Sequence, residues 1–256
     1  MSHPFSFYPH AASEWSEYFP DCGGTSQSPV DVITTQTKYD PSLVPVMPLG
    51  YSQHGNQPFS MHNNGHTGNY DSKLIWSSVQ LHLHWGNGGP GVGGSEHTIN
   101  GRSSDAELHV VHYNAELYPN MSAAMTQRDG LAVLGILIET NPGFNNILNY
   151  MSRIRHAGRY QRTFIPAFDV QSLLPKDLGR YYRYNGSLTT PPCYQSVIWT
   201  LPYISNLSFS SLQLLKMEMM LYSSKVQEVD RMLLQDNYRI TQPLNHRIIF
   251  ASFSAG

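Results

Sequence analysis

Short β-type runs of apolar and polar residues dominate the chain, and this pattern predicts β-strands. The clearest runs lie at residues 30–35, 79–85, 107–113, 132–139 and 196–201. A glycine-rich stretch, residues 86–94, follows the second run and predicts a loop. The chain is therefore expected to be rich in sheet.

Helical spacing of apolar residues occurs in two segments, 145–157 and 210–223. The face of the first is formed by Ile147, Leu148, Met151 and Ile154. The face of the second is formed by Leu214, Leu215, Met217 and Leu221. We interpret the methionines Met217, Met219 and Met220 as core filling rather than as a ligand-binding stripe. Because no repeat, charge block or linker divides the chain, we predict one domain, residues 1–256, dominated by β-sheet with peripheral helices.

The balance of charges narrows the class of protein. The 256 residues include 16 Lys and Arg against 18 Asp and Glu, a formal net charge of −2. This balance argues against a nucleic-acid partner and against a polybasic membrane-surface protein. With 40% hydrophobic and 13% charged residues, the composition is that of a globular chain. The longest apolar stretch, 131–138, is far too short to cross a bilayer.

The sequence QLHLHWG at residues 80–86 contains two histidines two positions apart. Side chains at i and i+2 of a strand share a face, so Gln80, His82 and His84 point the same way. Two imidazoles on one face of a rigid sheet make a metal-chelating pair. Taken alone, such a pair is also typical of polar residues on a half-exposed sheet face.

A second strand, ELHVVHY at residues 107–113, adds a third histidine. Glu107, His109 and Val111 share one face and His112 faces the other. If the two strands lie side by side, His82, His84 and His109 can form three corners of a tetrahedral Zn²⁺ site. The fourth corner is then left for solvent, the arrangement of a catalytic zinc.

Zinc-binding histidines need an acceptor for their second ring nitrogen. Gln80 and Glu107 each precede a histidine by two residues on the same face, so we expect them to fill this role. We assign His97 and His112 to structural hydrogen bonds.

These histidines belong to a longer series of motifs. The series is QSPVD (27–31), NNGH (63–66), QLHLHWG (80–86), SEHT (95–98), AELHVVHYN (106–114), GLAVLGILIE (130–139), YNGSLTTPPC (184–193) and FASF (250–253). With these motifs in this order, the chain resembles the α-class carbonic anhydrases over essentially its whole length. The resemblance implies a large, twisted, mostly antiparallel central sheet and a zinc enzyme that reversibly hydrates carbon dioxide to bicarbonate and a proton.

The resemblance also implies a role for individual residues. It makes His82, His84 and His109 the zinc ligands, and a zinc-bound hydroxide the group that attacks carbon dioxide. Thr189 would accept the hydrogen bond of that hydroxide and pass its own proton to Glu96. Thr190 matches a neighbour that binds bicarbonate or an anionic inhibitor, and aromatic sulfonamides are expected to bind the open zinc position.

Two further groups of residues carry over from the family. The apolar wall for carbon dioxide maps onto Val111, Val133, Leu188, Val197 and Trp199. His66 matches the proton shuttle, and its ordinary pKa near neutrality suits repeated protonation. The water network between metal and shuttle maps onto Tyr8, Asn64 and Asn69.

The chain departs from the family pattern between Asn69 and Gln80. Only the ten residues YDSKLIWSSV lie between them, where family members usually carry a longer excursion. Because this segment adjoins the shuttle and the water network, we expect any departure in the site to affect these groups more than the zinc ligands.

Cys22 and Cys193 match the single disulfide of the secreted and membrane-attached family members. The resemblance therefore implies a bridge and an extracellular location; two separate buried thiols in a cytoplasmic enzyme are the alternative. The first residues, MSHPFSFYPHAAS, have neither a basic region nor an apolar core. We therefore predict that this chain carries no signal peptide, any signal or anchor having been removed.

Two other functions compete with hydration of carbon dioxide. One is a catalytically silent domain that acts as a binding module; such relatives typically lose a zinc histidine, whereas this chain keeps all three. The other is a zinc esterase, since the same hydroxide can attack activated esters. Metal content distinguishes the first alternative, and relative turnover of carbon dioxide and esters the second.

Overall fold

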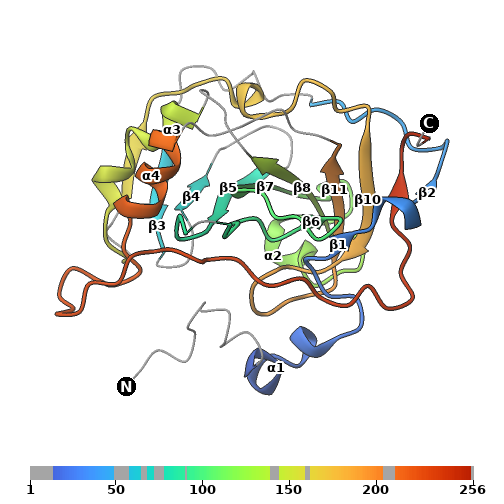
Figure 1. The fold of residues 1–256 in the computed structure, drawn as a ribbon, viewed down its shortest axis with the longest axis horizontal. Coiled ribbons are helices and arrows are strands. Elements are labelled where there is room, and N and C mark those ends of the chain that lie inside the picture. Colours follow the sequence, from blue (N-terminus) through green and yellow to red (C-terminus); the bar gives the residue numbers. More distant parts are fainter. Residues whose placement is uncertain are drawn as a thin grey trace.

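One large sheet organises the computed structural model (Figure 1). The structure describes residues 14–48, 58–64, 68–71, 78–89, 91–138, 144–158, 162–203 and 211–254. From edge to edge the ten strands are β2 (Lys38–Tyr39), β12 (Phe250–Ala251), β10 (Tyr181–Gly186), β11 (Val197–Pro202), β8 (Leu131–Ile138), β7 (Ala106–Tyr113), β5 (Ser78–Trp85), β4 (Gly68–Asp71), β3 (Phe59–Asn63) and β9 (Arg162–Ile165).

Neighbouring strands run antiparallel except where β11 meets β8 and where β12 meets β2. The predicted large, mostly antiparallel sheet is confirmed. Four of the five runs identified in the sequence correspond, within one residue at each end, to β5, β7, β8 and β11. These are the four neighbouring strands at the middle of the sheet.

The fifth run, residues 30–35, is mostly not a strand. Only Asp31–Val32 forms a strand, β1, and it pairs with β6 (Thr98–Ile99) in a separate two-stranded sheet. The chain then turns into a 3₁₀ helix at Thr34–Gln36, where the Asn100 side chain accepts from Thr34 N at 3.0 Å in place of a strand partner. The strands that the pattern did not identify are β2, β3, β4, β6, β9, β10 and β12.

Alternation along the central strands separates two apolar clusters. The helix-side cluster contains Leu81 and Leu108 of β5 and β7, together with Ile147 of α3 (Asn145–Leu148) and Met217 of α4 (Ser211–Met220). The site-side cluster includes Val111 of β7, Val133 of β8, and Val197 and Trp199 of β11. Because successive side chains of a strand point to opposite faces, the two clusters lie on opposite sides of the sheet.

The helices are short and lie outside the sheet (Figure 1). Besides α3 and α4 they are α1 (Trp15–Tyr18) and α2 (Met121–Ala124). The single helix expected at 145–157 is wrong: Tyr150 N donates to Ile147 O, three residues back, and a 3₁₀ helix at Met151–Ile154 follows α3. The predicted apolar face is nevertheless buried.

Helix α4 lies within the predicted segment 210–223 but faces the core with fewer residues than expected. Met217 and Leu221 are buried and Leu214 is partly buried. Leu215 and Met219 are each 53% exposed, so their assignment to the core is wrong. None of the helices in the described ranges has the length and apolar character needed to cross a membrane.

A disulfide between Cys22 and Cys193 joins the N-terminal segment to the chain just before β11. The two cysteines are buried against Trp15 in a small apolar cluster of their own. The predicted bridge is confirmed, and it ties the loop that follows β10 to a segment 171 residues away in sequence.

Candidate metal centre

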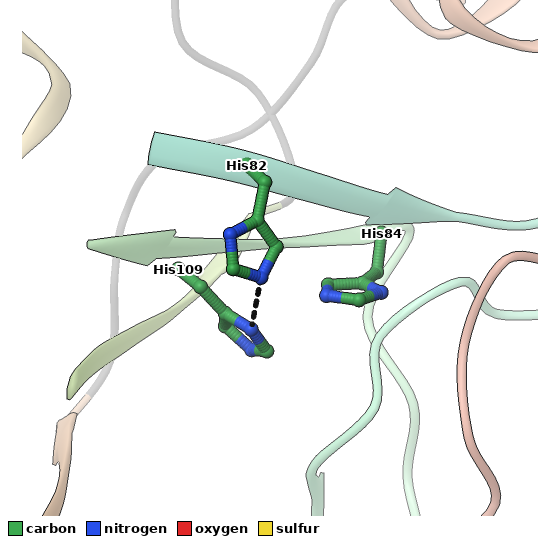
Figure 2. Close-up of side chains that lie close together, drawn as sticks. All are labelled: His82, His84 and His109. Atoms are coloured by element: carbon green, nitrogen blue, oxygen red, sulfur yellow. Dashed lines mark hydrogen bonds between the residues drawn. The ribbon is translucent and has the colours of Figure 1, made fainter. Parts of the chain in front are cut away.

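Three histidine side chains converge on the site-side face of the sheet (Figure 2). Strands β5 and β7 are antiparallel neighbours, and their register places His82 directly opposite His109. His84 follows two residues later on the same face. Figure 2 shows the three rings turned toward one another, with His82 Nε2 and His109 Nδ1 3.1 Å apart. One nitrogen from each ring lies within 4.8 Å of the others.

Hydrogen bonds to the outer nitrogens fix which nitrogen each of two rings presents. His84 Nδ1 donates to the backbone oxygen of Asn237 at 2.7 Å. A carbonyl oxygen can only accept, so His84 Nε2 carries the free lone pair. That atom is buried and has no hydrogen-bond partner within the described part of the chain. His109 Nε2 donates in the same way to Glu107 Oε1 at 2.7 Å, which leaves Nδ1 facing His82.

Glu107 is held by four hydrogen bonds. Its Oε1 accepts from His109 Nε2 and from His97 Nδ1, both at 2.7 Å. Its Oε2 accepts from the backbone nitrogens of Glu96 and His97 at 2.9 and 2.7 Å. Burial alone would raise the pKa of Glu107, but His97 and His109 hold it well below its usual range. A fixed carboxylate therefore stands behind His109.

Burial keeps the three rings neutral. It lowers the pKa of His84 to about 4, and it lowers those of His82 and His109 in the same direction. Neutral imidazole is the form that binds a metal. The donor set, three neutral ring nitrogens on rigid strands, suits Zn²⁺ and leaves a position for solvent.

Gln80 does not play the part expected of it. His82 Nδ1 is buried and makes no hydrogen bond to any residue the structure describes. Gln80 itself lies on β5 opposite Val111. The outer nitrogens of His84 and His109 thus have partners, and that of His82 has none in the part of the chain that the structure describes.

A second group of possible ligands shares the same face. His97, Glu107 and His109 also offer one atom each within 4.8 Å of one another. In this group, however, each atom is already committed: His97 Nδ1 and His109 Nε2 both donate to the carboxylate. Buried groups that satisfy one another in this way form a support rather than an open metal site.

Glu96 and Thr189 lie beside the histidine cluster. Glu96 Oε1 accepts from the backbone nitrogen of Arg239 at 2.8 Å, and Oε2 lies 3.8 Å from His109 Nε2. Burial raises the pKa of Glu96 to about 7, while the Thr189 hydroxyl acts in the opposite direction. Glu96 Oε2 is buried and has no hydrogen-bond partner of ordinary geometry among the described residues. Thr189 therefore lies near enough to act on this carboxyl, with one oxygen still available to it.

The loop that carries Thr189 and Thr190 is fixed at both ends. Leu188 N donates to Tyr194 O at 3.0 Å, and Cys193 N donates to Thr190 O at 2.9 Å. Cys193 is the disulfide partner of Cys22. Thr189 is buried and Thr190 is partly exposed.

The five residues expected to form the apolar wall belong to one cluster. Val111, Val133, Val197 and Trp199 are buried in the site-side cluster, and Leu188 is partly buried against it. Val111 pairs with Val133 across β7 and β8, and Val133 pairs with Trp199 across β8 and β11. The same face of the sheet thus carries the histidines and the apolar surface.

The residues expected to move protons are only partly described. Asn69 lies on β4 directly opposite His82, and Asn64 follows β3 and is exposed. Tyr8 and His66 lie outside the described residues. The register between β4 and β5 is regular at Asn69 despite the short segment that follows.

A hydrogen-bonded chain behind the metal centre was missed in the sequence. Beyond Glu107 and His97 it continues from His97 Nε2 to the Tyr184 hydroxyl at 2.6 Å, and from there to Ser28 Oγ at 2.8 Å. The structural hydrogen bonds assigned to His97 are present. Tyr184 and Ser28 fall within motifs of the family pattern, which was the available signal; Asn237, 153 residues from His84, had none.

Comparison with known proteins gives consistent results. Residues 10–253 match the family model described as eukaryotic-type carbonic anhydrase. The chain is 40% identical to carbonic anhydrase 12 of Homo sapiens, over 97% of this chain and 72% of that protein. It is 35% identical to carbonic anhydrase 6 of Homo sapiens, over 94% of this chain and 80% of the relative. It is 38% identical to carbonic anhydrase 6 of Bos taurus, over 93% of this chain and 76% of that protein.

Proposed function

Because the chain belongs to the eukaryotic-type carbonic anhydrases, a family of zinc enzymes that hydrate carbon dioxide, we propose that His82, His84 and His109 hold its Zn²⁺. The observation that carries this assignment is the orientation of the rings. Each presents one nitrogen to a common centre, and partners outside the centre fix the ring orientation of His84 and His109. When bound, Zn²⁺ supplies the Lewis acidity that makes hydroxide available from water near neutral pH.

The ligands would be His82 Nε2, His84 Nε2 and His109 Nδ1. His84 Nε2 is buried and has no hydrogen-bond partner among the described residues, and the other two nitrogens face each other at 3.1 Å. The carboxylate of Glu107 makes His109 a stronger metal ligand. A negatively charged hydrogen-bond acceptor at Nε2 raises the basicity of the other ring nitrogen.

The apolar side of the site would hold carbon dioxide next to this centre. The surface that would face this non-polar substrate has no hydrogen-bonding groups. It is formed by Val111, Val133, Leu188, Val197 and Trp199. Trp199 Nε1 is satisfied by Ser187 O at 3.0 Å, so its ring presents carbon atoms. Such a surface favours carbon dioxide and does not retain the charged product.

Thr189 would orient the attack. Its hydroxyl would donate to Glu96 Oε2, the carboxylate oxygen that has no hydrogen-bond partner among the described residues. Thr189 Oγ1 is then left to accept the hydrogen of the attacking oxygen, whose lone pair turns toward carbon dioxide. This hydrogen bonding would increase the rate through orientation, because the reacting atoms are held in the geometry of attack. Thr190, on the same fixed loop, would bind bicarbonate or an anionic inhibitor, and an aromatic sulfonamide would bind at the open metal position.

The proton released in each cycle would leave on the side of β3 and β4. Asn69, opposite His82, and Asn64 would order water between the centre and His66, with Tyr8 completing the network. His66 would accept the proton and pass it to buffer, since an imidazole titrates near neutral pH.

Two further proposals concern the whole chain. We propose that residues 1–256 form a single domain. We also propose an extracellular location, supported by the Cys22–Cys193 bridge, since such bonds persist in oxidising compartments.

The test is stopped-flow hydration of carbon dioxide by protein stripped with a chelator and then reloaded with zinc. We expect hydration of carbon dioxide to return in proportion to bound zinc, up to one ion per chain. Protein that binds one zinc ion and leaves the uncatalysed rate unchanged would contradict the proposal and favour a binding domain. Turnover of an activated ester in the absence of carbon dioxide hydration would favour the esterase.

A further inference from the structure

We propose that Gly135 is a positioning residue of the metal centre: its missing side chain leaves the space in which Glu107 holds His109. The inference rests on the proposed zinc site and adds a determinant of how tightly that site binds its metal.

The position of Gly135 follows from the strand register. On β8 it pairs directly with His109 of β7, so a side chain at position 135 would share the face of the sheet that carries the metal centre. Val133, two residues earlier on β8, belongs to the apolar wall on this face.

A methyl group at position 135 would enter occupied space. An ideal Cβ built on Gly135 lies 2.9 Å from Glu107 Oε1, 3.2 Å from Trp199 Cζ3 and 2.7 Å from Leu201 Cδ2. Contacts of carbon below 3.0 Å are not sustained in folded proteins, so at least two of these neighbours must move. Leu201 can move because its contacting atom is the end of a flexible side chain.

Glu107 cannot yield in the same way. The contacted oxygen, Oε1, is the one that accepts from both His97 Nδ1 and His109 Nε2. The other oxygen is held by the backbone nitrogens of residues 96 and 97. Any shift that relieves a methyl group at position 135 therefore lengthens a hydrogen bond to a histidine. Trp199 offers no alternative, because Ser187 O fixes its indole nitrogen.

A side chain at position 135 is expected to lower the affinity of the site for zinc. A carboxylate displaced from His109 no longer fixes that ring with Nδ1 toward the centre. Loss of such a supporting partner lowers metal affinity by about 10- to 100-fold. We expect Gly135→Ala to weaken zinc binding by a factor in this range.

The experiment measures zinc affinity by competition with a chelator and, in parallel, the thermal midpoint of the metal-free protein. Gly179→Ala is the matched control, since the nearest atom to a Cβ there is Asp177 Oδ1 at 3.3 Å, remote from the centre. Gly135→Ala should lose affinity and Gly179→Ala should not. Gly135→Ala with the affinity of the parent protein would overturn the inference.

A double-mutant cycle separates a positioning role from general damage. In a Glu107→Ala background the carboxylate is gone, so adding Gly135→Ala should change zinc affinity by no more than about twofold. If the two substitutions instead multiply, Gly135 does not act through Glu107 and the inference is wrong.

A second variant keeps the test decisive if Gly135→Ala folds poorly. Gly135→Ala with Leu201→Ala removes the 2.7 Å contact and retains the one to Glu107, so it should still bind zinc more weakly than Leu201→Ala alone. Equal affinities would contradict the proposal. Should the parent protein bind no zinc, the proposed function itself fails; should it bind zinc as tightly as Gly135→Ala does, only the present inference fails.

Discussion

The metal centre and the expected proton exit lie on neighbouring strands of one sheet but depend on different parts of the chain. The three histidines stand on β5 and β7, which have strand neighbours on both sides. His84 donates a hydrogen bond to the backbone oxygen of Asn237, and His109 donates one to the carboxylate of Glu107. Asn64 and Asn69 belong instead to the region of β3 and β4, next to the edge strand β9.

The two regions meet where β4 pairs with β5, which places Asn69 opposite His82. The metal centre is specified by strand pairing and by contacts far apart in sequence, so the length of one turn has little influence on it. The exit depends on where the connections around β4 place individual side chains. A shortened segment after Asn69 therefore affects the exit first, and variants in each region should separate the two.

The largest effect is expected when a ligand is removed. His109→Ala should reduce zinc affinity by far more than about a hundredfold, the upper range for a supporting residue, and abolish hydration of carbon dioxide. Metal analysis after dialysis and stopped-flow rates measure both. His112→Ala is the control, since His112 lies on the same strand but on the opposite face. A His109→Ala protein with full zinc and full rate would refute the ligand assignment.

The next effect concerns stability without loss of the centre. Replacing both Cys22 and Cys193 with serine should lower the free energy of unfolding by about 5 kcal/mol, the chain-entropy value for so long a loop. One zinc ion per chain should still bind, because β5 and β7 hold the three histidines without the bridge. Denaturant titration and metal content test this pair of expectations. Loss of zinc from folded double-serine protein would show that the three histidines depend on the Cys22–Cys193 bridge.

A smaller effect is expected at the support behind the ligands. Glu107→Gln should weaken zinc binding by about 10- to 100-fold, because an amide is a weaker acceptor for His109 Nε2. Competition with a chelator measures the change. Glu116→Gln, an exposed position with the same change of charge, serves as the control. Unchanged affinity in Glu107→Gln would mean that strand geometry alone sets the ligand orientation.

The smallest effect is expected in the exit. His66→Ala should slow turnover at low buffer concentration by about tenfold, less than for a general acid or base acting in the chemical step, because buffer can accept the proton instead. Added imidazole should restore the rate, and zinc affinity should not change. His62→Ala, on β3, is the matched control. Equal rates at every buffer concentration would mean that the shortened segment has removed His66 from the role.

Local alternation was enough to predict the middle of the sheet. Strands β5, β7, β8 and β11 are long, and each alternates between an apolar face and a face that carries the site. The convergence of His82, His84 and His109 followed once β5 and β7 were taken as neighbours. Strands β2 and β12, which lie toward one edge of the sheet and have two residues each, carry too little pattern to be identified.

The pattern of apolar and polar residues did not predict contacts between segments that are distant in sequence. Nothing near His84 indicates that Asn237 O accepts from it, and nothing near Gly135 indicates the position of Glu107 Oε1. Helix α4 shows the reverse error, because its apolar residues outnumber those the core can cover and Leu215 and Met219 remain exposed. Both failures arise because tertiary packing, rather than local periodicity, decides which side chains meet.

A crystal structure of the zinc-loaded protein with anomalous data at the zinc edge tests the central claim most directly. The account predicts one zinc ion bound to His82 Nε2, His84 Nε2 and His109 Nδ1, with Glu107 still hydrogen-bonded to His109 Nε2. Zinc bound instead by His97, Glu107 and His109, the second group of possible ligands among the described residues, would contradict it.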